Sequence, residues 1–459
     1  MKSVTLLCSI FLFAAICIAQ DRSIQFDSLF SSLHKEEKFS GNVLIAENGK
    51  PVFQKSYGKA LKEQNLDLNS ETIFELGSVS KQFTAMGIMI LKKQGKLDYE
   101  DSIRKFFPQL PYVKITIRQL LNHTSGLPDY MDMADQYWDK TKIMTNDDMI
   151  AMLAEKKPSV LFTPGEKWEY SNTGYALLAS VIEKVSGVSF NEFLQANIFQ
   201  PLGMHRTRVY RKRYEKSVIE NYAYGYVKDS TGRFVMSDSL PATAAMVYSL
   251  DGIYGDGVVN STTGDLLKWD QALYTDKLVN KEMLQEAFAD VKLNNGKTFN
   301  YGFGWLLINS NEFGRYYYHG GGWPGYVTWM ERHPRDNKTI ILLANAGQAN
   351  GSIKAIRNIL YGIVEKPLVE IPMDIKTLNQ YAGEYSFSGK DTLHVFVENG
   401  KLFANGAGQD KHQLFAETNE LFFRKDRDYK TRFVKDGNGK VGSLLILREG
   451  PAIEAIKIK

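Results

Sequence analysis

The segment at residues 366–373 divides this chain into two parts with different folding patterns. It contains Pro367 and Pro372, and proline interrupts helices and sheets because it has no backbone N–H to donate. Beyond this segment, apolar and polar residues alternate, and turn signals such as Asn399-Gly400 separate short runs, which is typical of antiparallel strands. We therefore predict a linker at 366–373 and a separate, small β-barrel-like domain at 374–459.

The part before the linker combines strand and helix patterns in an order that predicts a mixed fold. Residues 42–57 contain two strand-like runs around an Asn-Gly turn, which is a strong hairpin signal. The pattern is mostly helical between residues 115 and 210, and strand-like runs return between 302 and 344. We expect a domain at 20–365 of the α/β (α+β) type, with an antiparallel sheet built from both of its ends, flanked by helices, and a helical lobe.

The start of the chain predicts an export signal. Lys2 precedes a short apolar run, Leu6–Ala19, and polar residues follow it, which is the pattern of a cleaved signal peptide at 1–19. The run is too short to span a bilayer, so we expect a secreted or periplasmic mature chain with no transmembrane segment. Lipid anchoring is the less favoured alternative, because neither Cys8 nor Cys17 follows a small residue.

Charge and composition exclude several classes of function. The chain has 56 Lys and Arg against 52 Asp and Glu, and no basic tract is interleaved with aromatic residues, so we expect no nucleic-acid partner. The seven histidines are scattered and no His-Glu-x-x-His motif occurs, so we expect no metal site. The sequence also lacks the Gly-x-Ser-x-Gly motif that an α/β-hydrolase would carry.

The strongest chemical signal is Ser78, which stands three residues before Lys81 at the start of an apolar, helix-patterned segment. At this spacing a hydroxyl and an amine lie on one face of the first helical turn. The amine can hold or take the proton that a nucleophilic serine must lose. The same Ser-x-x-Lys spacing begins at Ser32, Ser56 and Ser102, but only at Ser78 does it open a long apolar helix.

Two further motifs offer the remaining parts of an acyl-transfer site. The only Tyr-x-Asn motif in the chain, Tyr170–Asn172, lies in a loop before a helix pattern. A phenol acts as a base only where a cation stabilises its anion, and Lys81 is a candidate for that cation. The segment His319–Gly322 ends a strand-like run. Its glycines leave room for a substrate, and a backbone N–H there can pair with that of Ser78 to bind an oxyanion.

These motifs, in this order, resemble those of the penicillin-recognising serine hydrolases, the superfamily of class C β-lactamases, DD-peptidases and related esterases. The segments His123–Leu127, Pro164–Glu166 and Pro201–Met204 are similar to further motifs of that superfamily. The resemblance covers roughly residues 25–365 and implies a β-lactamase/transpeptidase-like fold, and the C-terminal module resembles the small β domain that some relatives carry. We expect His123 to brace its loop.

The resemblance also implies a role for each residue of the site. Ser78 would be the acylated nucleophile, Lys81 and Tyr170 would share the base and acid roles, and Asn172 would orient the lysine and the substrate amide. The N–H groups of Ser78 and Gly322 would form the oxyanion hole. Such a mechanism needs no metal and no organic cofactor, and which of Lys81 and Tyr170 is the general base is left open.

One position departs from the superfamily pattern. His319-Gly320-Gly321 stands where β-lactamases and DD-peptidases of this type carry Lys-Thr-Gly. A histidine with an ordinary pKa of about 6.5 is a weaker and pH-dependent anchor for a carboxylate. The resemblance nevertheless implies substrate binding at Asn172, His319, Gly321 and Gly322.

The departure also bears on the substrate. We expect a small-molecule or peptide substrate, either an ester or a D-amino-acyl amide or peptide, and poor turnover of β-lactams. The alternatives are a penicillin-binding DD-peptidase, a class C-like β-lactamase, a non-hydrolytic binder of cell-wall peptide and a scaffold protein that has kept the fold. The oligomeric state is not predicted by any of these patterns.

Overall fold

The structure is a computed structural model that describes residues 21–347, 349–364, 367–387, 391–406, 410–425, 429–447 and 452–459. The predicted signal peptide therefore lies outside the described residues. The chain forms two compact units, of which the first contains the described residues up to Leu307 together with Phe313–Asn350, and the second contains Ile308–Glu312 and Gly351–Lys459. The boundaries expected from the sequence, 20–365 and 374–459, stay predictions.

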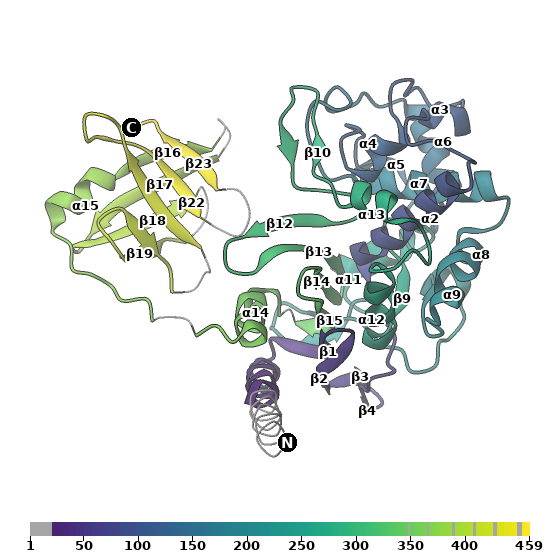
Figure 1. Cartoon of the computed structure of the whole chain (residues 1–459), viewed down its shortest axis with the longest axis horizontal. Coiled ribbons are helices and arrows are strands. Elements are labelled where there is room, and N and C mark those ends of the chain that lie inside the picture. The colour runs from purple at the N-terminus through teal and green to yellow at the C-terminus, as the bar shows by residue number, and fades with distance from the viewer. Residues whose placement is uncertain are drawn as a thin grey trace, which may run out of the picture. The chain divides into compact units, whose positions relative to one another are not determined.

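The main sheet joins strands from the two ends of the first part of the chain. Its strand order is β12-β13-β14-β15-β1-β2, and β1 pairs antiparallel with both β2 and β15. Figure 1 shows the purple strands from the chain start beside the green strands from near residue 340. The strands span β1 Phe39–Glu47, β2 Lys50–Tyr57, β12 Leu306–Ser310, β13 Gly314–Trp323, β14 Tyr326–His333 and β15 Lys338–Gly347. The predicted antiparallel sheet is confirmed.

The β1–β2 hairpin forms where the Asn-Gly signal predicted it. Asn48 and Gly49 both have positive φ angles, 51° and 71°, which is the backbone geometry that a two-residue hairpin turn requires. Strand β1 is buried along almost its whole length, because it has a neighbouring strand on each side and residues packed on both faces. The strands extend beyond the expected run 42–57 at the N-terminal end.

Helices surround the central helix α2 (Lys81–Lys93), which is buried over most of its length and contacts α7 (Asn172–Ser186). Ser78 itself lies in a short 3₁₀ turn, Gly77–Ser80, rather than in the α-helix that the pattern predicted. Residues 21–35 are also helical. Further helices are α3 Ile103–Phe106, α4 Ile117–Leu121, α5 Tyr130–Tyr137, α6 Asn146–Lys156, α8 Phe190–Leu194, α9 Gln200–Leu202, α10 Lys212–Glu215, α11 Pro241–Ser249, α12 Thr263–Ala272, α13 Lys281–Ala287, α14 Ile353–Tyr361 and α15 Ile375–Tyr381.

A short sheet of strand order β5-β9-β6 leads the chain into the turn that carries Ser78. Strand β5 (Phe74–Glu75) pairs antiparallel with β9 (Val259–Ser261), and β9 pairs with β6 (Arg208–Val209). The remaining short strands are β3 Lys59–Leu61, β4 Leu66–Asp67, β7 Tyr226–Lys228, β8 Phe234–Met236, β10 Val291–Lys292 and β11 Thr298–Phe299. The serine is therefore held between two buried elements, a sheet and a helix.

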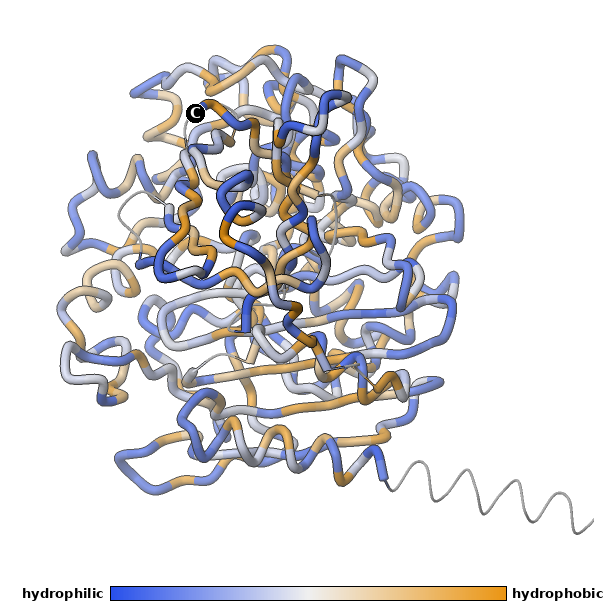
Figure 2. Tube along the Cα trace, turned by 90° about the vertical axis from the view of Figure 1, so that its left-hand side faces the viewer, coloured by the Kyte–Doolittle hydropathy of each residue, from blue (hydrophilic) through white to orange (hydrophobic). Residues whose placement is uncertain are grey.

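One large apolar core fills the first unit. It includes α2 and α7 side chains and the inner face of the main sheet, and Phe83 packs against Trp269 with ring centroids 4.7 Å apart. Figure 2 shows orange, hydrophobic stretches along interior strands and blue, hydrophilic residues mostly at loops and turns. Among the described residues, no helix combines the length and the apolar character that crossing a membrane would require.

The C-terminal part folds as a closed barrel, which confirms the predicted all-β module. Its strands are β16 Gly383–Phe387, β17 Asp391–Glu398, β18 Lys401–Gly406, β19 His412–Ala416, β20 Leu421–Phe423, β21 Lys430–Lys435, β22 Val441–Leu447 and β23 Ile453–Lys457. Tyr381 and Phe433 stack at 4.5 Å in its core. Closure of the barrel leaves no unpaired edge strand.

Candidate active site

Ser78 and Lys81 form a hydrogen-bonded pair, as their spacing predicted. The ammonium or amine nitrogen Nζ of Lys81 lies 3.1 Å from Ser78 Oγ. The lysine side chain is 0% exposed, and Ser78 lines a cavity. The serine oxygen is therefore open to a substrate on one side and contacts a buried amine on the other.

Lys81 is also held by two groups that can only accept. Its Nζ donates to Asn172 Oδ1 at 2.9 Å and to the Asp256 backbone carbonyl at 2.8 Å. A neutral amine has two protons and one lone pair. When both protons point at Asn172 and Asp256, the lone pair is left for Ser78 Oγ. The geometry therefore suits proton transfer from the serine to the lysine once Lys81 is neutral.

Asn172 is oriented by a carboxylate that the sequence analysis missed. Its side-chain amide Nδ2 donates to Asp129 Oδ2 at 2.9 Å. The other carboxylate oxygen of Asp129 accepts from Met131 N at 2.9 Å and so caps helix α5. With Nδ2 bound to Asp129, the amide oxygen of Asn172 must face Lys81. An Asp directly before a helix pattern is an N-cap signal, but nothing in the sequence linked it to Asn172.

Tyr170 lies over the same lysine. Its ring centroid is 4.9 Å from Lys81 Nζ and 4.3 Å from the ring centroid of His123. Tyr170 and Ser78 both line the cavity. Within the described residues, no hydrogen bond joins the Tyr170 hydroxyl to Ser78 or Lys81, so its role as acid or base stays a prediction.

Strand β13 lies directly against the turn that carries Ser78. An added Cβ at Gly321 would lie 2.0 Å from the carbonyl oxygen of Leu76, and one at Gly77 would lie 2.9 Å from Gly322 N. The Thr328 hydroxyl donates to the same Leu76 carbonyl at 2.6 Å. Only glycine permits this approach, which brings the backbone of Gly322 to the nucleophile turn. Gly322 itself is exposed and borders the cavity.

His319 and His123 are linked through a tyrosine that the sequence analysis did not identify. Tyr301 Oη lies 3.0 Å from His123 Nε2 and 3.0 Å from His319 Nε2. His123 Nδ1 accepts from Ser171 N at 3.1 Å, and His319 Nδ1 lies 2.7 Å from the Gly320 carbonyl. The chain of contacts joins the Tyr170–Asn172 loop to strand β13, which is the bracing that we expected of His123.

The backbone groups at the two ends of this series of hydrogen bonds determine where its protons lie. Ser171 N–H can only donate, so the His123 proton lies on Nε2, and the Gly320 carbonyl can only accept, so the His319 proton lies on Nδ1. The Tyr301 hydroxyl therefore accepts from His123 and donates to His319. With both rings neutral, each ring nitrogen of His123 and His319 and the Tyr301 hydroxyl has a hydrogen-bond partner.

Burial keeps both histidines neutral. Desolvation, and then the charge of Lys81, lower the pKa of His319 to about 3 and hold the pKa of His123 well below its ordinary value of 6.5. His319 is 3% exposed, and both of its ring nitrogens are engaged by Tyr301 and Gly320. The expectation of a pH-dependent anchor assumed an ordinary pKa of about 6.5 for His319, and this assumption is corrected, because the sequence could not show how deeply the ring is buried. Its contact with substrate stays a prediction.

The cavity in front of Ser78 has a volume of about 410 Å³. Its lining combines Ser78, Tyr170, Asn172 and Gly322 with a mostly apolar wall made of Tyr130, Met131, Met246, Leu250, Ile253, Val258, Trp323 and Pro324. Among the described lining residues, Glu75 and Asp256 carry carboxyl groups. Among the described residues there is no group of three or more His, Cys, Asp or Glu side chains that could hold a metal ion.

Comparison with known proteins finds a match for each of the two parts of the chain. Residues 26–361 match the β-lactamase family, and residues 369–454 match a domain of unknown function, DUF3471. The chain is 42% identical over 451 residues to penicillin-binding protein 4* of Bacillus subtilis (strain 168), an alignment that covers 96% of this chain and 100% of that protein.

Two solved structures are similar to this one. An octameric penicillin-binding protein homologue from Pyrococcus abyssi has a TM-score of 0.64 and 26% identity, with 94% of this chain and 98% of that chain covered. A D-stereospecific amidohydrolase from Streptomyces sp. has a TM-score of 0.58 and 26% identity, with 71% and 95% covered.

Proposed function

The chain belongs to the β-lactamase family, and on this basis we propose that it is a serine hydrolase that works through an acyl-enzyme on Ser78. The observation that carries the proposal is the contact of Lys81 Nζ with Ser78 Oγ at 3.1 Å, with two acceptors holding the other positions of the amine. A buried amine so placed can accept the serine proton as the nucleophile attacks.

The reaction has two steps. Ser78 Oγ attacks the carbonyl carbon of the substrate, its proton passes to the Lys81–Tyr170 pair, and the pair returns the proton to the leaving amine or alkoxide. Water then attacks the acyl-enzyme, and Ser78 regains its proton. The N–H groups of Ser78 and Gly322 would stabilise the oxyanion in both steps, and a preorganised donor of this kind is worth about 10²–10³ in rate.

The substrate class that we propose is an ester or a D-amino-acyl amide or peptide. The cavity offers an apolar wall and acidic residues, and none of its described lining residues is a lysine, an arginine or a histidine. A DD-peptidase or β-lactamase substrate carries a carboxylate that needs a cation, so this lining disfavours those alternatives. The likeness to a D-stereospecific amidohydrolase supports an amide with a D-configured acyl group.

Labelling with a fluorophosphonate tests the nucleophile. The wild-type protein should be labelled once, the Ser78→Ala variant should not be labelled, and Ser32→Ala, which alters another Ser-x-x-Lys position, should be labelled like wild type. Persistent labelling of Ser78→Ala would show that another residue is the nucleophile. The substrate class is tested by hydrolysis of a p-nitrophenyl ester, a D-amino-acyl p-nitroanilide and a chromogenic cephalosporin, and faster turnover of the cephalosporin would overturn the proposed preference.

We also propose that the protein is exported. The support is the charged start, apolar run and polar boundary of residues 1–22, which fit a cleaved secretory signal. N-terminal sequencing of the protein from the culture medium or the cell envelope should give a mature chain that begins at Gln20. An intact start at Met1 would refute cleavage.

A further inference from the structure

Glu75 is a buried carboxyl group at the active-site cavity that the catalytic mechanism does not use. It ends strand β5, three residues before Ser78, and it lines the same cavity. The residue is 6% exposed. An acidic side chain is rarely so buried without a partner, so its surroundings decide what it can do.

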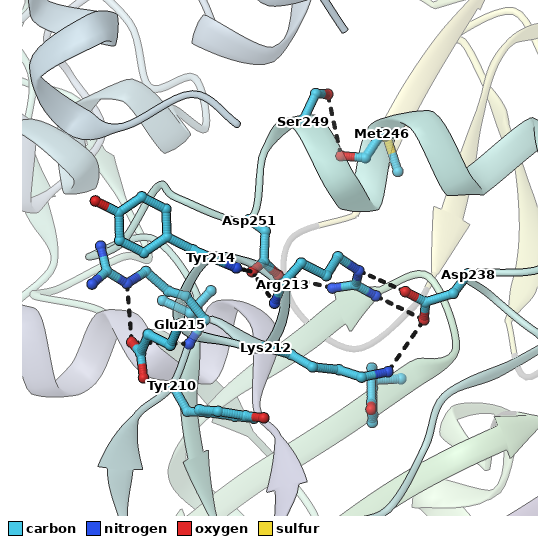
Figure 3. Close-up of polar contacts among 12 residues, drawn as sticks. Tyr210, Lys212, Arg213, Tyr214, Glu215, Asp238, Met246, Ser249 and Asp251 are labelled. Atoms are coloured by element: carbon cyan, nitrogen blue, oxygen red, sulfur yellow. Dashed lines mark hydrogen bonds and ion pairs between the residues drawn. The ribbon is translucent and has the colours of Figure 1, made fainter. Parts of the chain in front are cut away.

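No hydrogen bond or ion pair of the described residues reaches the Glu75 carboxyl, and the nearby basic groups are engaged elsewhere. Arg213 donates to both oxygens of Asp238 at 2.7 and 2.9 Å and to Asp251 Oδ1 at 2.8 Å. Lys212 Nζ lies 3.4 Å from Asp238 Oδ2. Figure 3 shows the Arg213 guanidinium between the two aspartates, with Lys212 beside Asp238. Two cations thus face two aspartates, and Glu75 has no counter-ion of its own.

Burial makes the ionised form of Glu75 costly. Desolvation is the main cause that raises the pKa of Glu75 to about 8. Arg213 and Lys212 lower it, whereas Asp251 and Asp238 raise it. Tyr222 and Tyr326 interact electrostatically with the same carboxyl, and burial raises the pKa of both phenols. The free protein therefore holds a neutral acid at this wall, which a ligand cation would convert to a carboxylate.

The other acid in the cavity is already occupied. Asp256 Oδ2 accepts from the Tyr130 hydroxyl at 3.0 Å, and the Asp256 backbone carbonyl holds Lys81. Glu75 is thus the acid that lines the cavity with its hydrogen-bonding capacity unused. Since the wall around it is apolar, a carboxylate formed there would attract an ammonium group strongly.

We propose that Glu75 forms a subsite for an ammonium group carried on the acyl portion of the substrate, which selects D-amino-acyl amides or esters with a free amino group. This inference rests on the proposed function, because the acyl portion is defined by attack at Ser78. When the cationic substrate binds, Glu75 releases its proton to solvent and its carboxylate accepts hydrogen bonds from the ammonium. No other group changes its charge.

The test measures how well two competitors protect Ser78 from fluorophosphonate labelling. D-Alaninamide carries a free ammonium, and N-acetyl-D-alaninamide is the matched neutral compound. In the wild-type protein, D-alaninamide should protect at a concentration lower by about tenfold to a hundredfold, the factor that a charge-assisted hydrogen bond supplies. Glu75→Gln, which has the same shape and no charge, should remove this advantage. The quantity compared is the ratio of the two protecting concentrations within each variant, so a change in the labelling rate that affects both competitors equally cancels.

Glu71→Gln is the matched control, because Glu71 is an exposed glutamate on the same stretch of chain. It should behave like wild type with both competitors. Equal protection by the two compounds in the wild-type protein would overturn the inference without using any variant. An unchanged advantage of D-alaninamide in Glu75→Gln would overturn it as well. Absence of labelling at Ser78 would instead refute the proposed function, so the two failures are distinguishable.

Discussion

Replacing Gly321 by alanine should push strand β13 away from the turn that carries Ser78. The new Cβ would lie 2.0 Å from the Leu76 carbonyl oxygen and 2.2 Å from Thr328 Oγ1. Real Cβ contacts are essentially never shorter than 3.0 Å, so the two backbones must move apart by about 1 Å or the turn must distort. Because the nearest atom is a backbone carbonyl oxygen and not the end of a flexible side chain, a small side-chain movement cannot relieve the clash.

That movement displaces the Gly322 N–H from the oxygen that it is proposed to bind. Misplacement by about 1 Å costs on the order of a hundredfold in rate, and loss of an oxyanion donor costs about 10²–10³. We therefore expect the rate of Ser78 acylation to fall by about a hundredfold or more in Gly321→Ala. Overpacking should also lower the free energy of unfolding by about 1–3 kcal/mol.

Gly320→Ala is the neighbouring control. A Cβ at Gly320 would meet its nearest atom, a Trp329 ring carbon, at 3.6 Å, which is ordinary contact. Both variants are assayed by fluorophosphonate labelling rate at a temperature well below their thermal unfolding, so that lost stability is not read as lost activity. Equal labelling rates in the two variants would refute the claim that β13 and the nucleophile turn touch without room for a side chain.

Three further changes test the groups around the site. Because the pKa of Glu75 is about 8 in the folded chain and 4.5 ordinarily, the unfolded chain loses this proton first as the pH rises. As the pH rises from 4.5 to about 8, the free energy of unfolding of the wild-type protein should therefore fall relative to that of Glu75→Gln, by at most about 5 kcal/mol. Thermal melts in which the difference between the two proteins does not change with pH would contradict this. Tyr301→Phe leaves two buried histidine nitrogens without their partner and should cost about 1–3 kcal/mol. Tyr99→Phe removes a buried hydroxyl that has no hydrogen-bond partner among the described residues and should cost little, and a denaturant titration of both tyrosine variants measures these changes in the free energy of unfolding. Asp129→Ala should lower the acylation rate by about tenfold through loss of the Asn172 orientation, and Asp129→Asn, which keeps an acceptor oxygen, should retain more activity than Asp129→Ala.

Spacing along the chain was enough to predict the parts of the protein that depend on near neighbours. The Asn-Gly turn at residues 48–49 predicted the first hairpin, and alternation beyond residue 374 predicted the all-β module. Ser78 and Lys81 are three residues apart, and a single turn of helix brings their side chains together whatever surrounds them. The exact form of that turn was not predicted, because a 3₁₀ turn and an α-helical turn share this spacing.

The environment of each side chain was decided by the tertiary structure. His319 is neutral because other segments bury it and Tyr301 binds it, and no local pattern reports either fact. Asp129 reaches Asn172, and Asp256 reaches Lys81, across long separations in sequence. Glu75 differs from any surface glutamate only in what surrounds it. The sequence by itself determined which reactive groups the chain carries and how near neighbours meet. Their charge, partners and access to substrate depend on desolvation and on contacts between distant segments, which exist only in the folded chain.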